Sequence, residues 1–292
     1  MVFNGIPAIQ ADKVQNMELY VQKKIYESLK FLSILPTQQN PSGLFTSYMQ
    51  GDVEVADPEY VANGITYNEI RFGEGSTVSG QIKPVGYKYT ASTRDEQRGR
   101  YMSQLQQFYN QAVIKIADFY ETKYADAIKA GGRASTTTLK SWDTAENIIT
   151  NEVILDDEMR YDAHDNATGF VPNTVLCNRK DRLTIESALR KENYAESNFD
   201  YIASSKIAQG DFIIFDKNNP GAVIEKYVDP QYSVIQSLEN DGLTTTEDGT
   251  VIPPAFLNIS EVRPNRPQTI ENYIWAESAL NIQNSNGFLV IK

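Results

Sequence analysis

The chain has 292 residues, of which 41% are hydrophobic and 22% charged, and its formal net charge is −11. This composition is ordinary for a folded globular protein and excludes wholesale disorder. The acidic balance argues against a protein whose main task is to grip nucleic acid, because phosphate binding needs a basic surface, but it leaves open a shell that surrounds a polyanion. We expect neither export nor membrane insertion, because no stretch approaches about 18 apolar residues and the first residues do not resemble a signal peptide.

The first third of the chain predicts a helix followed by a long extended segment. Residues 12–32 show apolar positions between lysines and glutamates, which is typical of an amphipathic helix. Residues 48–92 are rich in Gly and Tyr and alternate apolar with polar side chains, which predicts a two-stranded β-hairpin. Such a long segment is rare inside a compact domain, and an isolated hairpin is marginal in water. We therefore expect the hairpin to project and to lie on another chain.

A single long helix is predicted over residues 93–130. Thr93 and Glu96 have the spacing of a capping box, and Gly131 and Gly132 supply the C-terminal stop. At 1.5 Å per residue the helix would be roughly 50 Å long and would serve as a spine. Apolar residues recur at helical spacing, namely Leu105, Phe108, Ala112, Ile116, Phe119 and Ala127.

The second half of the chain predicts two further helices and several strands. A helix is expected over 143–161, a strand over 174–177, and a helix that opens near Lys180 and Asp181. Residues 200–237 alternate strongly, with a turn at 218–221, and are interpreted as a β-meander. The chain then ends with a strand or short helix through Tyr273 and Trp275, a turn, and an apolar strand over 288–291. The expected apolar side of the helix over 143–161 comprises Ile148, Ile149, Val153, Leu155 and Met159.

The sequence offers no arrangement typical of catalysis or metal binding. His164, the only histidine, lies in a polar run without a nucleophile or an orienting partner, so we expect it at the surface. Cys177 permits neither a disulfide nor a zinc site and is expected to be a small buried hydrophobe in a reducing compartment. The acidic run over 156–158 is better explained as solvated carboxylates than as a Mg²⁺ or Ca²⁺ site, because adjacent residues of a helix point to different faces. We expect no enzyme activity, cofactor or metal.

The order of these elements resembles the major capsid proteins of tailed viruses with the HK97 fold. The most specific part is residues 147–185, where a helix leads to the apolar strand and Asn-x-Lys-Asp turn of "NTVLCNRKDRLTI". The ending "ESALNIQNSNGFLVIK" is similar to that family's last strand. The resemblance implies an α+β fold with an N-terminal arm over 1–47, an E-loop hairpin over 48–92, a peripheral domain with the spine helix over 93–142 and 199–275, and an axial domain over 143–198 and 276–292.

The resemblance also implies a function. It points to a major capsid protein that self-assembles into hexamers and pentamers of an icosahedral shell enclosing viral double-stranded DNA. Such a protein belongs to the virion and is assembled in the host cytoplasm. Its partners would be copies of itself, with a separate scaffold, portal or decoration protein as optional partners, DNA without sequence-specific contacts, and no membrane.

The E-loop segment carries the candidate inter-subunit contacts. Alternation places Glu69 and Arg71 on one face of a strand, and basic side chains would offset the repulsion between acidic copies. Some members of the family form a Lys–Asn cross-link from this loop, but no activating carboxylate or Asn partner is evident for Lys83 or Lys88, so ordinary ion pairs are the simpler expectation. The candidate contact residues are Tyr67, Glu69, Arg71, Phe72, Lys83, Tyr87 and Lys88.

Two other functions remain open at the level of the sequence. An encapsulin-type nanocompartment shares the fold but encloses protein cargo. A soluble enzyme or carbohydrate-binding module would instead use the long insert as a lid over its substrate. Closed shells in electron micrographs would favour a capsid or an encapsulin. A discrete monomer would favour the enzyme or binding module.

Overall fold

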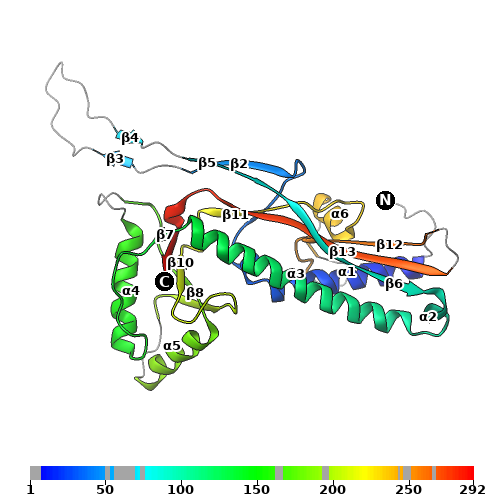
Figure 1. Cartoon of the computed structure of the whole chain (residues 1–292), viewed down its shortest axis with the longest axis horizontal. Coiled ribbons are helices and arrows are strands. Elements are labelled where there is room, and N and C mark those ends of the chain that lie inside the picture. The colour runs from blue at the N-terminus through cyan, green and yellow to red at the C-terminus, as the bar shows by residue number, and fades with distance from the viewer. Residues whose placement is uncertain are drawn as a thin grey trace, which may run out of the picture. The chain divides into compact units, whose positions relative to one another are not determined.

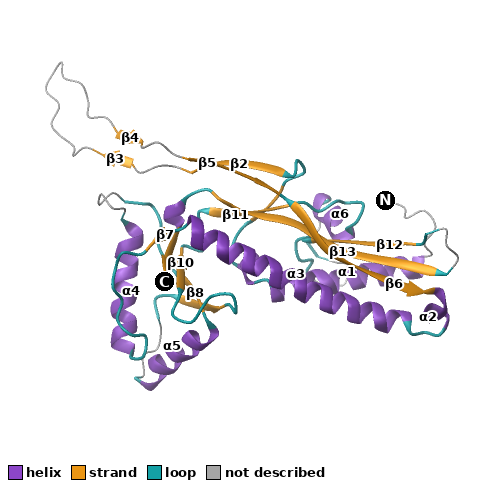
Figure 2. Cartoon of the chain, viewed as in Figure 1, coloured by secondary structure: helices purple, strands orange, loops and turns teal. Residues whose placement is uncertain are grey.

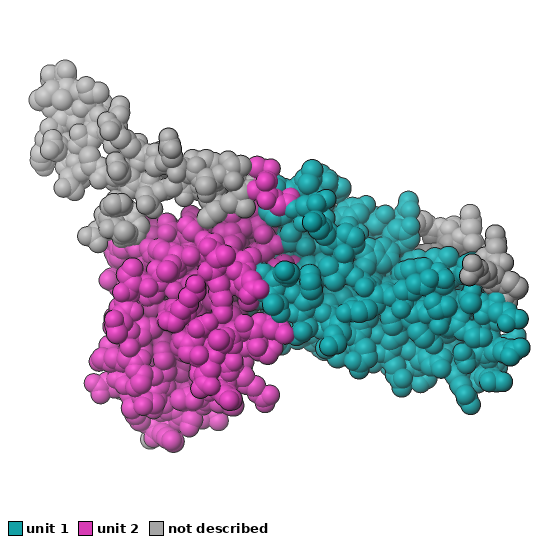
Figure 3. All heavy atoms as spheres, in the orientation of Figure 1, with its two compact units in different colours: residues 1–45, 81–123, 224–279 teal, residues 46–80, 124–223, 280–292 magenta. Residues whose placement is uncertain are grey.

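The computed structural model describes residues 8–49, 53–55, 70–72, 76–161, 167–192, 197–242, 244–245, 251–264 and 268–292 (Figure 1). The chain divides into two compact units, coloured separately in Figure 3. Unit 1 comprises ranges 1–45, 81–123 and 224–279, and unit 2 comprises 46–80, 124–223 and 280–292. Each unit therefore combines early, middle and late parts of the sequence.

Unit 1 is built on a five-stranded sheet whose central strand is β13 (Thr269–Ile282). Side chains along most of β13 alternate between buried and half-buried, which is the period-two pattern of a strand with one face in the core. β13 thus confirms the strand alternative for the segment through Tyr273 and Trp275. The other strands are β1 (Thr37–Gln39), β6 (Lys83–Ser92), β11 (Ala222–Lys226) and β12 (Leu257–Val262).

Tyrosines fix the long helix to this sheet. Tyr101 donates its hydroxyl to Asn272 Oδ1 at 2.9 Å, and Tyr120 donates to the carbonyl oxygen of Ala276 at 3.0 Å. Both rings are buried. A buried tyrosine contributes apolar area and needs a partner for its hydroxyl, and both needs are met here.

The long helix begins later than the sequence predicts. Ser92 caps a short helix, α2 (Thr93–Gln97), by accepting a hydrogen bond from the Arg94 N–H, and the chain then turns at Gly99, where φ is +71°. The spine, α3 (Tyr101–Gly131), starts after this turn. The prediction of one helix from residue 93 is therefore wrong, because glycine readily adopts the left-handed conformation that ends α2. Of the predicted apolar stripe, Leu105, Ala112 and Ile116 are buried, Phe108 and Ala127 are half-buried, and Phe119 is exposed.

Helix α1 (Ala8–Ser28) joins unit 1 through a side chain that imitates a peptide group. Gln22 is fully buried; its Nε2 donates to the carbonyl oxygen of Leu257 at 2.7 Å. Its Oε1 accepts from the N–H groups of Phe256 at 2.9 Å and Leu257 at 3.1 Å. The start of β12 therefore completes its hydrogen bonding with a side chain from the beginning of the sequence. A short 3₁₀ helix (Lys30–Ser33) follows α1.

A second polar contact from α1 holds α6 (Val234–Asn240), which was expected to be a strand. Glu18 accepts from Ser233 Oγ at 2.6 Å and from the Val234 and Ile235 N–H groups at 3.0 and 3.1 Å. Burial raises the pKa of this carboxyl, and the hydrogen bonds offset part of the rise. Ser233 caps α6 locally by accepting a hydrogen bond from the Gln236 N–H, and Glu18 adds further acceptors from far away in the sequence, so the sequence-based prediction missed a local cap as well as a distant one.

Unit 2 is built on a sheet with the strand order β7 (Arg133–Ala134), β14 (Phe288–Ile291), β10 (Phe212–Phe215), β8 (Thr174–Cys177) and β9 (Asp200–Ala203). All residues of β8 and β10 are buried. Strands covered on both faces read as continuous apolar runs, which is why β8 and β14 were predicted at their observed positions.

Helices α4 (Ala145–Arg160) and α5 (Arg179–Lys191) accompany this sheet (Figure 2). Thr144 caps α4 and Asn178 caps α5, each by accepting a hydrogen bond from an N–H of the first turn. Ile148 and Leu155 of α4 and Ile185 of α5 lie in one buried cluster with the strands. The predicted apolar side of α4 is correct for Ile148, Leu155 and Met159, whereas Val153 is exposed and Ile149 is half-buried.

The expected β-meander does not form. β9 pairs in parallel with β8, and β10 pairs antiparallel with both β8 and β14. β11 lies in the other sheet, where it pairs in parallel with β1. The alternation of apolar and polar residues predicted these strands correctly, but it cannot specify their partners. Here β11 pairs with β1 from early in the sequence, and β10 pairs with β14 from late in the sequence.

Four short strands form two separate two-stranded ladders. β2 (Leu44–Met49) pairs with β5 (Ser76–Gln81), and β3 (Val53–Val55) pairs with β4 (Ile70–Phe72). The expected return strand of the hairpin, which includes Tyr87, is instead β6 and pairs with β13 in unit 1. The predicted hairpin pairing is therefore wrong, because the segment before residue 56 supplies the partner strands.

Candidate inter-subunit surfaces

The two ladders contain part of the predicted contact set. The antiparallel register of β3 and β4 places Arg71 opposite Glu54 and Phe72 opposite Val53. Within the described part of the chain, β2 to β5 pair only with one another. Tyr67 and Glu69 lie outside the described residues. The structure thus places two of the seven candidates on a ladder that has no third strand among the described residues.

The other three candidates, Lys83, Tyr87 and Lys88, lie on β6. Lys88 Nζ forms an ion pair with Glu271 Oε1 at 2.7 Å and lies 5.3 Å from the ring centre of Tyr273, which itself donates to Glu271 Oε2 at 2.6 Å. The hydrogen bond to Glu271 raises the pKa of the Lys88 ammonium. Lys88 therefore has partners within its own chain, whereas Tyr87 remains 45% exposed.

Gly86 lies opposite Trp275 in the antiparallel pairing of β6 with β13, and this close pairing requires glycine. A Cβ atom at this position would lie 2.4 Å from the Ile274 carbonyl oxygen and 2.4 Å from Trp275 Cβ. Both atoms belong to the paired strand and have little freedom to move. Only glycine lets the two backbones approach this closely.

The ionisable groups inside the units serve structural roles. Glu152 of α4 is buried and accepts hydrogen bonds from Tyr201 Oη at 2.8 Å, from the Asn198 N–H at 3.2 Å and from Ser197 Oγ. Burial, and then Glu152, raise the pKa of the Tyr201 hydroxyl. Cys177 is fully buried, and burial raises its pKa to about 12, so its thiol stays protonated at neutral pH. The predicted buried thiol is confirmed.

A buried lysine lies in unit 1. Lys226 on β11 donates its ammonium to the carbonyl oxygen of Ala255 at 2.5 Å, and Glu239 Oε2 accepts from the Ala255 N–H at 3.1 Å. Burial lowers the pKa of Lys226, and the charge of Glu239 opposes this effect. In the described ranges no three His, Cys, Asp or Glu side chains gather as metal ligands. His164 lies outside those ranges.

The acidic run over 156–158 belongs to the surface network of α4. Asp156 pairs with Arg160 at 2.7 Å. Glu158 accepts from Ser135 Oγ at 2.7 Å and from the Thr136 N–H at 2.7 Å. The expectation was solvated carboxylates, whereas Asp156 and Glu158 bind donors of the protein itself.

Comparison with known proteins gives a clear answer for the fold. No family model matches the sequence, and no curated protein matches it. The structure, however, is similar to the virus-like particle from Pyrococcus furiosus, with a TM-score of 0.60 and 14% identity over 95% of this chain and 98% of that chain. It is also similar to the capsid of an empty GTA particle, with a TM-score of 0.53 and 10% identity over 91% and 89% of the two chains. The chain has the HK97-like capsid fold.

The HK97-like fold is a shell-forming one in both capsids and encapsulins. The encapsulin of the holo-SrpI complex from Synechococcus elongatus PCC 7942 has a TM-score of 0.50 and 8% identity over 90% of this chain and 86% of its own. The predicted fold class is therefore confirmed, and the likeness includes both kinds of shell. Among the described helices of this HK97-like chain, none has the length and apolar character needed to cross a membrane.

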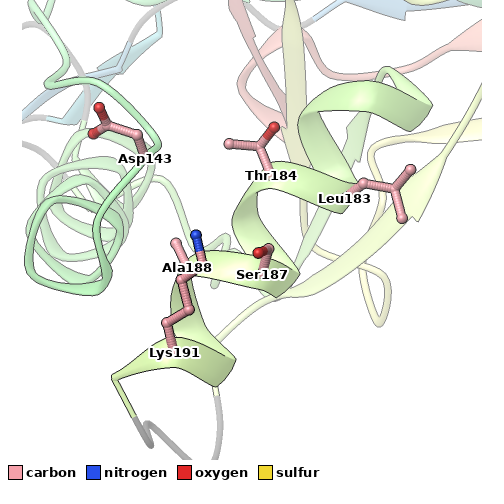
Figure 4. A pocket seen from close by; sticks show the side chains of 6 residues that line it. All are labelled: Asp143, Leu183, Thr184, Ser187, Ala188 and Lys191. Carbon is pink, nitrogen blue, oxygen red and sulfur yellow. The ribbon is translucent and has the colours of Figure 1, made fainter.

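Unit 2 of the HK97-like chain carries a surface feature that the sequence analysis missed. An open groove of about 360 Å³ lies between α5 and the turn before α4 (Figure 4). Leu183 at its rim is 57% exposed. A signal was present in "RKDRLTIESALRK", where five basic residues and a leucine at an outward position occur in an acidic protein. The groove is lined by Asp143, Leu183, Thr184, Ser187, Ala188 and Lys191.

Proposed function

We propose that this protein is a major capsid protein that self-assembles into hexamers and pentamers of a closed icosahedral shell around viral double-stranded DNA. The observation that carries the proposal is that the likeness to shell proteins extends over nearly the whole of both chains and includes both units. A closed shell requires each copy to make several different contacts with its neighbours, and a chain with paired strands outside its main sheets suits that task. The proposed place of action is the virion, with assembly in the host cytoplasm.

In this proposal unit 1 is the peripheral domain and unit 2 contains the axial domain. The paired strands β2 to β5 are the E-loop, and residues before β1 are the N-terminal arm. These boundaries differ from the expected ones. β6 belongs to the unit 1 sheet, β9 and β10 belong to the unit 2 sheet, residues 124–142 belong to unit 2, and the paired strands begin at Leu44. The spine α3 begins in unit 1.

The contact residues of the E-loop remain part of the proposal. Tyr67, Glu69, Arg71 and Phe72 would contact a neighbouring copy, together with the exposed Lys83 and Tyr87 at the start of β6. Lys88 would contribute only by giving up part of its pairing with Glu271. Copies of the chain are the principal partners, and a scaffold, portal or decoration protein would add to them.

The test is the state of the purified protein. Negative-stain electron microscopy and size-exclusion chromatography should show closed particles of uniform diameter at micromolar concentration. A discrete monomer under varied salt, pH and concentration would contradict the proposal.

An encapsulin-type compartment is the second candidate, because an encapsulin is among the structural neighbours. The two functions differ in what the shell contains. Particles purified from the native source, after nuclease treatment, should hold protected double-stranded DNA if the shell is a capsid. A stoichiometric second protein without protected DNA would favour the compartment.

A further inference from the structure

The two exposed helices of unit 2 carry opposite charge. α4 has five acidic residues and one basic residue, whereas α5 has five basic and two acidic residues. The chain as a whole is acidic, so α5 is an exception on its surface. Both helices place their apolar sides in the same buried cluster, which leaves their other sides in solvent.

The exposed side of α4 contains a stripe of three residues. Glu146, Val153 and Asp157 are separated by seven and then four positions, which keeps them on one face of a helix. All three are exposed, and Val153 is 59% exposed although it is apolar. Neither carboxylate takes part in an ion pair with another described residue. We call this set the α4 stripe.

The exposed side of α5 contains a stripe with the same spacing in the reverse direction. Arg190, Leu183 and Arg179 are separated by seven and then four positions, and all three are exposed. Neither guanidinium pairs with a carboxylate among the described residues. We call this set the α5 stripe. Leu183 lines the groove of Figure 4, so the stripe runs beside a concave surface.

We propose that the α5 stripe of one copy docks antiparallel on the α4 stripe of a second copy. In that register Glu146 meets Arg190, Val153 meets Leu183 and Asp157 meets Arg179. The outer residues of each stripe are about 16 Å apart along the helix axis, so both ion pairs form at once. An apolar contact between two charge pairs has the composition of a small interface, with the charges fixing register and partner.

The second copy is the occupant because the complementary stripe is on this chain itself. The two stripes are different surfaces, so each copy can offer its α5 stripe to one neighbour and its α4 stripe to another. Such a heterologous contact propagates from copy to copy and closes into a ring when the rotation fits. The inference rests on the proposed shell function and names one of its contacts.

A role within each single chain would explain part of the same pattern. Glu146 in the first turn of α4 and Arg190 in the last turn of α5 complement the dipoles of their own helices. That role accounts for neither Val153 nor Leu183, and it predicts no dependence between the two helices. The two explanations therefore differ in whether a change on α5 is rescued by a change on α4.

Charge reversal tests this dependence. Arg179→Glu with Arg190→Glu should raise the critical concentration for particle formation at least tenfold, measured by light scattering and size-exclusion chromatography. Glu146→Lys with Asp157→Lys should do the same. The quadruple variant should return to within about threefold of the parent, because both pairs are restored with opposite polarity. Additivity of the two defects would overturn the inference.

Net charge needs its own control, because the quadruple variant also restores the charge of the parent. Lys115→Glu with Lys217→Glu reverses two exposed charges outside the stripes. Combined with Glu146→Lys and Asp157→Lys, it has the same net charge as the quadruple variant but should assemble no better than the α4 reversal alone. Equal rescue by this control would show that net charge decides assembly and would overturn the inference. Melting temperatures should confirm that all the variants fold.

A cross-link tests the register directly. A mixture of Val153→Cys and Leu183→Cys proteins should form a disulfide-linked dimer on mild oxidation, whereas neither variant alone should do so; Cys177 is buried and stays protonated. Absence of the mixed dimer in particles that do form would overturn the docking while leaving the shell function intact. Failure of the parent to form particles would contradict the shell function instead, so the two failures are distinguishable.

Discussion

The sheet of unit 2 and the ladders β2–β5 and β3–β4 use strands of similar length but differ in what covers them. In the unit 2 sheet, β8 and β10 are entirely buried and are paired on both edges. In the ladders, each strand has one partner among the described residues, and Leu44 of β2 is 63% exposed. Two-stranded ladders are marginal alone in water, whereas a covered sheet is stable by itself. The difference separates the part of the chain that stabilises the fold from the part that is available for association.

The largest effect should follow from a charge placed in the covered sheet. Ile214 on β10 is fully buried, and Ile214→Asp would leave a carboxylate without a partner. We expect a loss of several kcal/mol, which is a large share of the 5–15 kcal/mol that typically stabilises a domain, and no cooperative thermal transition by circular dichroism. The control is Lys217→Asp at an exposed position just after the strand. Cooperative melting of Ile214→Asp near the temperature of the parent would mean that this sheet is not the core.

A smaller loss of stability is expected where Gly86 of β6 pairs with β13. Gly86→Ala forces a Cβ atom against the Ile274 carbonyl oxygen, and the strain should lower the free energy of unfolding by about 2 kcal/mol. Thr90→Ala, at an exposed position on the same strand, should change it by no more than about 0.5 kcal/mol. Urea unfolding measures both. Equal stability of the two variants would show that the strands can separate locally without cost.

A pH-dependent effect is expected from the buried lysine of unit 1. Burial lowers the pKa of Lys226 in the native state below its ordinary value of 10.5. At a pH between the lowered pKa and 10.5, the native state therefore binds fewer protons than the unfolded state. The free energy of unfolding of the parent should therefore rise with pH in this window, relative to Lys226→Met, by at most about 1.4 kcal/mol for each pH unit. Urea unfolding at neutral and at alkaline pH measures the difference. Lys217→Met, which removes an exposed charge, is the control. A free energy of unfolding that falls in the parent relative to Lys226→Met as the pH rises would contradict the assignment.

The smallest effect on folding should come from removing the β3–β4 ladder. Replacing residues 53–72 by a short Gly-Ser linker keeps β2, β5 and β6 and should shift the melting temperature by no more than about 3 °C. The same variant should fail to form particles. Replacing only residues 56–69 retains both strands but removes Tyr67 and Glu69, so it separates the contribution of these two proposed contacts from that of the ladder. A large loss of the circular dichroism signal would show that the ladder stabilises the fold, as the unit 2 sheet does, and is not a separate surface for association.

Much of the local structure could be predicted from the sequence, because local signals decided it. Strand β8 has its predicted bounds, and α4 and α5 begin after Thr144 and Asn178, whose side chains cap them. The order of elements was enough to suggest the HK97 fold, which the structural neighbours confirm. These successes share a cause: each depends on residues within a few positions of one another.

The failures in strand pairing have the opposite cause. The partners of β6, β9, β10 and β11 are set by strands far away in the sequence, so alternation identified strands but not sheets. Two helix boundaries were missed for reasons that are at least partly local: Ser233 caps α6, with Glu18 as an additional distant partner, and the turn at Gly99 delays the start of α3. For the candidate contacts, Lys88 has an in-chain partner that only the pairing of β6 with β13 could show. The contacts of Tyr67, Glu69, Arg71 and Phe72 remain predictions.

The hydrogen bonds of Gln22 delay the completion of unit 1 during synthesis of the chain. This side chain leaves the ribosome early, yet its partners on Phe256 and Leu257 lie more than 230 residues later. At a synthesis rate of about 5–20 residues per second, the wait is roughly 10–50 s. During this interval unit 1 lacks the strand that binds Gln22, so α1 is not yet fixed to its sheet. Contacts between copies that depend on a complete unit 1 can therefore form only after this interval.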